Sequence, residues 1–167
     1  MARRRLRVAL DANVLIAGIR LPRWPHEVIR AAIGGHFDLV LPRQVIDEAR
    51  RHLNTARLEA LEFVLSQSIH EEVSMPSPDL VDRNSDLVRS RKDVPIALAL
   101  LAGETDIFVT NDRDFTEPDA TAQRFRGRAP VMLPAVFLRE VCAWSSDDLE
   151  AIRNRTWEDM PAGTGNE

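Results

Sequence analysis

The sequence predicts an α/β fold in which helices cover both faces of a parallel sheet. Short apolar runs alternate along the chain with longer segments of helical periodicity. The short runs are nearly continuous in apolar residues, which is typical of strands that are buried on both faces. With 167 residues, 44% of them apolar and 29% charged, the chain has the size and composition of one globular domain.

Four short strands are expected, because four runs are rich in β-branched, aromatic and aliphatic residues. The first run ends at Asp11, the second is closed by Pro42, and the third is followed by Asn111 and Asp112. The predicted strands cover residues 6–10, 37–41, 107–110 and 131–133.

Helices are expected between and after these strands, because apolar residues recur there at helical spacing and stop signals follow. Gly34 and Gly103 end two of them, and Ser146 is the expected N-cap of the last. The residues 14–19 begin a helix or a turn, and residues 74–79 form a Ser/Pro-rich connection. The predicted helices cover residues 26–35, 44–53, 57–66, 79–90, 95–102, 135–144 and 146–156. The last residues, 161–167, are expected to be disordered.

Charge and cysteine content restrict the class of protein. The net charge of −4 is not typical of a nucleic-acid-binding protein, although a few clustered carboxylates would offset a basic rim in that count. The lone Cys142 rules out an intramolecular disulfide and a cysteine-rich zinc site; we expect a buried thiol and a cytoplasmic location. No apolar run reaches the roughly 20 residues that cross a bilayer. Asp11 and Asn13 interrupt the apolar part of the N-terminus, so we do not expect a signal peptide.

Acidic residues stand where strands end or helices begin. Asp11 follows the first strand and Asp112 follows the third. If these strands are neighbours, the two carboxylates share one crevice beyond the carboxyl ends of the sheet. Glu48 lies in the helix after the second strand, with Asp47 as an equally placed alternative, and Asp93 directly precedes the helix 95–102. Each position also has a simpler explanation, since Asp and Asn are common in turns, as helix caps and on exposed helix faces.

Several carboxylates in one crevice repel each other and resist ionising together. A divalent cation such as Mg²⁺ or Mn²⁺ relieves that repulsion, prefers oxygen ligands, and can activate water and stabilise charge on a phosphate. The residues alone leave this metal site and ordinary turn chemistry about equally open. The sequence contains no zinc-spaced His or Cys cluster, no P-loop, no GxGxxG and no GxSxG.

Three stretches in order resemble the PIN domain, and within it the VapC-type toxin ribonucleases of prokaryotic toxin–antitoxin systems. These stretches read ALDANVLIAG at 9–18, LPRQVIDEARRHL at 41–53 and RKDVPIALALLAGETDIFVTNDRDF at 91–115. The residues that match the family pattern are Asp11 and Asn13 of Asp-x-Asn-Val, Glu48, Asp93 of Asp-Val-Pro, Thr110 and Asp112 of Thr-x-Asp, and Asp114. The resemblance covers about residues 6–141, so we expect a PIN domain over residues 1–145 and a C-terminal helix and tail over 146–167.

The resemblance implies a PIN-like, Rossmann-like three-layer α/β/α sandwich and a Mg²⁺- or Mn²⁺-dependent endoribonuclease that hydrolyses RNA phosphodiester bonds. It implies a homodimer and a small antitoxin protein as partner. We expect no membrane association, because no apolar run is long enough to cross a bilayer. Its catalytic and metal-binding residues would be Asp11, Glu48, Asp93 and Asp112, supported by Asn13, Thr110 and Asp114.

Two other classes of protein remain as alternatives. A non-catalytic PIN module would bind RNA or a protein partner without cutting, although such modules usually lack some of the acids. A receiver domain or a haloacid-dehalogenase-type phosphatase also has acids at strand ends. The phosphatase needs an Asp where Asn13 stands, and the receiver needs a late Lys, whereas the only lysine here is Lys92.

Overall fold

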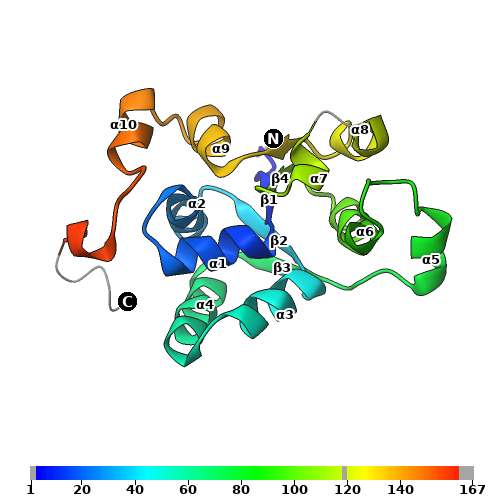
Figure 1. Ribbon diagram of the computed structural model, residues 1–167, viewed down its shortest axis with the longest axis horizontal. Coiled ribbons are helices and arrows are strands. Elements are labelled where there is room, and N and C mark those ends of the chain that lie inside the picture. The colour runs from blue at the N-terminus through cyan, green and yellow to red at the C-terminus, as the bar shows by residue number, and fades with distance from the viewer. Residues whose placement is uncertain (1–2, 118–119, 162–167) are drawn as a thin grey trace.

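The computed structural model describes residues 3–117 and 120–161, and within them the chain forms one sheet of five parallel strands. The strand order is β3-β2-β1-β4-β5 (Figure 1). The strands are β1 (Arg7–Leu10), β2 (Asp38–Pro42), β3 (His70–Val73), β4 (Ile107–Val109) and β5 (Val131–Met132). The predicted α/β class, a three-layer sandwich around a central parallel sheet, is confirmed.

Helices form the two outer layers of this sandwich. Figure 1 shows α1 to α4 and α9 on one side of the sheet and α5 to α8 on the other. The helices are α1 (Ala12–Arg20), α2 (Trp24–Ile33), α3 (Arg43–His52), α4 (Thr55–Gln67), α5 (Pro78–Arg83), α6 (Val94–Ala102), α7 (Arg113–Thr116), α8 (Ala120–Arg126), α9 (Pro134–Glu140) and α10 (Ser146–Ala151). Short 3-10 turns cover Arg91–Asp93 (η1) and Trp157–Asp159 (η2).

The core lies on both faces of the three central strands. Val8, Ala9 and Leu10 of β1 have no solvent exposure, and neither do Phe108 and Val109 of β4. Burial on both faces explains why these strands are continuous apolar runs in the sequence. Every described helix is too short or too polar to cross a lipid bilayer.

The sequence did not predict β3. Its residues His70, Glu71, Glu72 and Val73 pair only with β2, so the strand lies at the edge of the sheet. The two glutamates are exposed to solvent. Charged side chains are common on edge strands, where they discourage pairing with other chains, and they remove the apolar run by which a strand is recognised.

The predicted helix over residues 79–90 is wrong in its second half. Helix α5 ends at Arg83, and residues 84–90 form turns and bends. Leu87 and Val88 are nevertheless buried, with 3% and 1% of their surface exposed. This loop is therefore fixed to the core by two apolar side chains rather than by helical hydrogen bonds. Helices α7 and α8 lie in a stretch for which the sequence predicted no element.

The two C-terminal helices are shorter than predicted. Helix α9 ends at Glu140, and α10 ends at Ala151. The N-cap of α10 is Ser145 rather than the predicted Ser146, because the Ser145 hydroxyl accepts the Asp148 backbone N–H at 3.0 Å and the Asp148 carboxylate accepts the Ser145 backbone N–H at 3.2 Å. This reciprocal pair is a capping box.

Beyond α10 the chain returns to α1 and α2. Arg155 forms an ion pair with Glu27 of α2 at 2.6 Å, and the Trp157 indole N–H donates to the Arg20 carbonyl at 2.8 Å. The C-terminal segment up to Pro161 therefore docks on the body of its own chain. The predicted disordered tail falls almost entirely on residues 162–167, which lie outside the described residues.

Candidate metal centre

The candidate site lies beyond the carboxyl ends of β1 and β4, which are neighbours in the sheet as the sequence analysis required. Leu10 pairs with Val109, and the Asp11 backbone N–H donates to the Val109 carbonyl at 3.0 Å. Asp11 therefore directly follows β1 at the edge where Thr110 and Asp112 follow β4. Two segments about one hundred residues apart in the chain deliver polar side chains to one place.

Asp11 is buried, and both of its carboxylate oxygens accept hydrogen bonds. Its Oδ1 accepts the Ala12 backbone N–H at 2.8 Å, which makes Asp11 the N-cap of α1. Its Oδ2 accepts the Thr110 hydroxyl at 2.7 Å. Burial raises the pKa of Asp11, the two hydrogen bonds lower it, and the negative charges of Asp112 and Glu48 raise it again, with a net rise. The side chain is thus held in one orientation beside other acids.

Thr110 connects the two acidic segments. It has no solvent exposure, and its hydroxyl oxygen accepts the Asp112 backbone N–H at 2.9 Å while its hydrogen goes to Asp11. Asp112 in turn caps the short helix α7, since its Oδ1 accepts the Asp114 backbone N–H at 2.9 Å. The sequence left open whether these acids serve as turn and cap residues or form an acidic site. The structure shows turn and cap hydrogen bonds, and these bonds orient the acids of the site.

Asp93 enters the site from the other side, on η1 just before α6. It is only 7% exposed, and its Oδ2 is buried without a hydrogen-bond partner among the described residues. Its side chain forms no capping bond to α6, so helix capping does not explain this residue. Burial, and then the negative charge of Asp112, raise the pKa of Asp93 to about 6, although a hydrogen bond with Ser90 opposes the shift.

Asp93, Asp112 and Asp114 form the tightest group of acids in the described part of the chain. One carboxylate oxygen from each lies within 4.8 Å of the others. Asp11 and Glu48 do not belong to this triad, but Asp11 is linked to it electrostatically: the charges of Asp112 and Glu48 both raise the pKa of Asp11. The structure therefore brings Asp93 and Asp112 together with Asp114, which was predicted only in a supporting position. Metal binding by Asp11 and Glu48 stays a prediction.

The structure also separates the two candidates on α3. Glu48 is half-buried and its charge raises the pKa of Asp11. Asp47 is exposed, and its carboxylate lies 3.8 Å from the Arg43 guanidinium. Glu48 is thus the acid of α3 that faces the site.

Asn13, predicted to orient the carboxylates, is exposed in the first turn of α1. Within residues 3–117 and 120–161 no hydrogen bond joins its side chain to an acid of the site. An orienting role for Asn13 stays a prediction.

One basic residue of the site was not predicted. The Arg89 guanidinium approaches Asp114 Oδ1 with Nη2 at 2.7 Å and Nε at 2.9 Å, and Glu117 Oε2 with Nη1 at 3.3 Å. No sequence signal marks this contact, because Arg89 is 25 residues from Asp114 and comes from the loop between α5 and η1.

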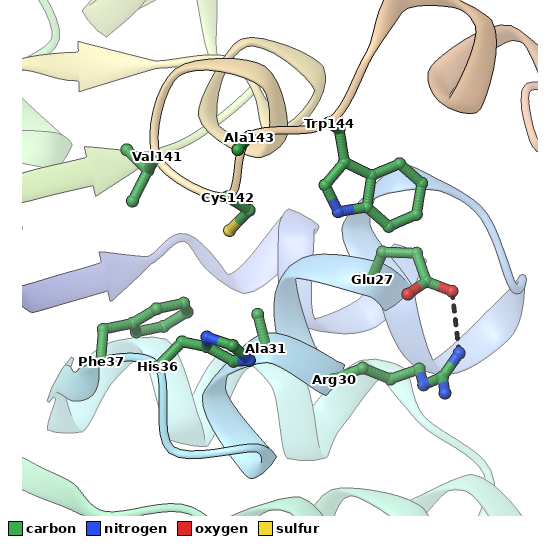
Figure 2. Close-up of a pocket in the computed structure, with 9 residues that line it drawn as sticks. All are labelled: Glu27, Arg30, Ala31, His36, Phe37, Val141, Cys142, Ala143 and Trp144. Atoms are coloured by element: carbon green, nitrogen blue, oxygen red, sulfur yellow. Dashed lines mark hydrogen bonds and ion pairs between the residues drawn. The ribbon is translucent and has the colours of Figure 1, made fainter.

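A cavity of about 450 Å³ lies at the opposite, amino-terminal edge of the sheet, between α2 and the chain that follows α9 (Figure 2). Its one carboxylate, Glu27, is paired with Arg30 at 3.2 Å and with Arg155 at 2.6 Å. Cys142 lines this cavity and is half-buried, not fully buried as predicted; burial raises the pKa of its thiol, which keeps it protonated at neutral pH. The cavity has no second acid, so the acidic chemistry belongs to the carboxyl ends of the strands.

No family model and no curated protein matches this chain. Among solved structures, the chain is similar to the crystal structure of PAE2754 from Pyrobaculum aerophilum. The two chains are 16% identical, and the alignment has a TM-score of 0.52 over 83% of this chain and 97% of that one. Similarity at this level of identity shows a shared fold and nothing more.

The residues of the triad fit a small, hard divalent cation. All three side chains offer carboxylate oxygens, the ligand type that Mg²⁺ and Mn²⁺ prefer. The buried Oδ2 of Asp93 has no donor among the described residues, and an unpaired buried oxygen of this kind is costly unless a cation or a donor reaches it.

Proposed function

We propose that this protein is a Mg²⁺- or Mn²⁺-dependent endoribonuclease that hydrolyses RNA phosphodiester bonds and acts as the toxin of a toxin–antitoxin pair. One observation carries the metal-dependent part of this proposal: Asp93, which has a buried oxygen without a hydrogen-bond partner among the described residues, forms a triad with Asp112 and Asp114. The choice of RNA as substrate, a small antitoxin as partner and a homodimer as the assembly rest on the resemblance of the sequence motifs to VapC-type PIN domains.

Asp93, Asp112 and Asp114 would hold the metal ion, with Asp11 and Glu48 at the side of the site that α1 and α3 form. Such an ion, when bound, lowers the pKa of water and offsets negative charge that develops on a phosphate. The protein supplies a fixed arrangement of acids that needs no reorganisation during the reaction.

Asp11 and Glu48, which lie outside the triad, differ in how their carboxylates are held. Thr110 holds the Asp11 carboxylate from one side and the Ala12 backbone N–H holds it from the other, so Asp11 keeps its orientation when the substrate enters. Glu48 is half-buried beside Asp11, and no ion pair within the described residues engages its carboxylate. Glu48 would therefore add its negative charge to that of Asp11 at this side of the site.

The proposal is tested with purified protein and a labelled single-stranded RNA. We expect cleavage with Mg²⁺ or Mn²⁺, none with EDTA, and a loss of at least about 100-fold in Asp93→Asn or Asp11→Asn with the fold preserved. Asp47→Asn is the matched control, because it removes a neighbouring acid that faces away from the site.

Cleavage that persists in EDTA, or that the Asp93→Asn, Asp11→Asn double variant leaves undiminished, would overturn the proposal. Binding of RNA without cleavage under every metal condition would instead support a non-catalytic PIN module.

A further inference from the structure

We infer that Arg89 is a positioning residue that holds Asp114 in the carboxylate triad, and this inference rests on the metal site proposed above. Arg89 acts through Asp114, which it contacts directly.

The contact geometry fixes the direction of the Asp114 carboxylate. Nε of Arg89 donates a hydrogen bond to Oδ1 at 2.9 Å, and Nη2 lies 2.7 Å from the same oxygen in an ion pair. A charge-assisted hydrogen bond from a planar guanidinium, with a second nitrogen close to the same oxygen, restricts the orientation of the carboxylate. Because Oδ1 is held in this way, the direction of the Asp114 carboxylate within the triad is fixed.

Arg89 also holds the rest of the short helix that carries Asp114. Helix α7 has four residues, too few to be stable without tertiary contacts. Arg89 binds Asp114 in its first turn and Glu117, which directly follows the helix, at 3.3 Å. Apart from Arg89, the main anchor of α7 is the buried ring of Phe115, which packs edge-to-face on Phe108 of β4 at 5.0 Å.

The loop that carries Arg89 is itself fixed. Leu87 and Val88, directly before Arg89, are buried in the core, and Asp93 follows four residues later. One segment therefore supplies both a ligand of the triad and the cation that orients another ligand. Because the main chain of this segment is anchored next to Arg89, its guanidinium can hold α7 rather than follow it.

The expected effect is on metal affinity and not on the stability of the fold. The Arg89 side chain is 42% exposed, and exposed ion pairs add little to the free energy of unfolding. Groups that orient metal ligands, in contrast, typically change metal affinity by about 10-fold to 100-fold. We expect the lower end of that range, because solvent reaches this pair.

A different role for Arg89 would give the opposite result. If the arginine acted only through its positive charge, it would repel the incoming cation, and its removal would strengthen metal binding. The sign of the change in affinity therefore distinguishes positioning from repulsion.

The test measures Mn²⁺ affinity from the electron paramagnetic resonance signal of free Mn²⁺, in the wild type, Arg89→Ala, Asp114→Asn and the double variant. We expect Arg89→Ala to weaken binding about 10-fold. In the Asp114→Asn background the same change should add less than about 2-fold, because the two residues act as one unit. Arg89→Lys, which keeps a cation within reach of Asp114, should fall between the wild type and Arg89→Ala.

Arg91→Ala is the matched control. It removes the same charge from the neighbouring turn, but its partner is Asp82 at 2.6 Å, and both side chains are exposed. We expect the Mn²⁺ affinity of Arg91→Ala to stay within about 2-fold of the wild type. Circular dichroism checks that each variant is folded.

The outcomes separate the two proposals. If the wild type binds Mn²⁺ and Arg89→Ala binds it equally or more tightly, or loses the same factor in the Asp114→Asn background, the positioning role is wrong and the metal site stands. If the wild type itself binds no Mn²⁺ at millimolar concentrations, the metal site is wrong, and the role of Arg89 falls with it.

Discussion

The raised pKa of Asp93 predicts that removing its charge stabilises the metal-free protein. The pKa rises from an ordinary value of 3.8 to about 6, mainly because the carboxylate is buried. One pKa unit corresponds to 1.36 kcal/mol, so at neutral pH the ionised Asp93 lowers the free energy of unfolding by about 3 kcal/mol. Asp93→Asn keeps the shape of the side chain, removes the charge and removes this cost.

The pH dependence has a definite sign. Between pH 3.8 and about 6 the folded protein binds more protons at this position than the unfolded protein does. The free energy of unfolding therefore falls as pH rises through this window, and the full cost is present above it. The difference between Asp93→Asn and the wild type should be about 2–3 kcal/mol at pH 7.5 and should vanish below about pH 4.

The assay is urea unfolding in EDTA at pH 4, 5, 6 and 7.5, followed by circular dichroism. Asp47→Asn, an exposed acid near Arg43, is the control and should change the free energy of unfolding by less than about 0.5 kcal/mol at every pH. An Asp93→Asn variant that is less stable than the wild type at pH 7.5, or a stability difference that does not depend on pH, would refute the reasoning.

Three other predictions concern metal binding, the Thr110 hydrogen bond and the ion pair of Glu27 at the opposite edge of the sheet. Mn²⁺ at about one hundred times its Kd should stabilise the wild type by about 2.7 kcal/mol in a thermal unfolding scan; an unchanged Tm would count against any metal site. Thr110→Val removes the 2.7 Å hydrogen bond to Asp11 and should lower the RNA cleavage rate by about 10-fold or more, whereas Thr110→Ser should retain most of it; equal rates would show that the hydroxyl is dispensable. Arg155→Ala leaves the buried Glu27 carboxylate without its 2.6 Å partner and should cost about 2–4 kcal/mol in urea unfolding, while Arg153→Ala, which breaks an exposed pair, should cost less than about 1 kcal/mol; similar losses would contradict the ranking by burial.

The parts of the fold that the sequence predicted are those whose burial is uniform. Strands β1, β2 and β4 are buried on both faces, so their apolar runs are unbroken and their positions could be predicted from the sequence. Strand β3 has one neighbour and exposed glutamates, so its sequence lacks that pattern although its backbone pairs fully with β2. An apolar pattern in the sequence indicates which residues are buried. It therefore identifies a strand only where the paired backbone is also buried.

The acids of the site were predictable for a different reason. Asp11 and Asp112 end strands that are adjacent in the sheet, and a parallel sheet places such positions together without any knowledge of side-chain contacts. Asp93 was a weaker inference, because a residue before a helix is often only a cap, and the absence of a capping bond could be learned only from the structure. The contact of Arg89 with Asp114 could not be predicted from the sequence, since it depends on how the loop at residues 84–90 packs.

The site combines two buried carboxylates whose environments differ, and the difference indicates where a cation would matter most. Asp11 accepts hydrogen bonds at both oxygens, which offset much of the cost of its burial. Asp93 leaves a buried oxygen unpaired next to the charges of Asp112 and Asp114. A buried carboxylate oxygen without a partner is costly, and a bound cation would remove that cost. The hydrogen bonds to Asp11 therefore account for its fixed orientation, whereas the triad around Asp93 accounts for the proposed requirement for metal.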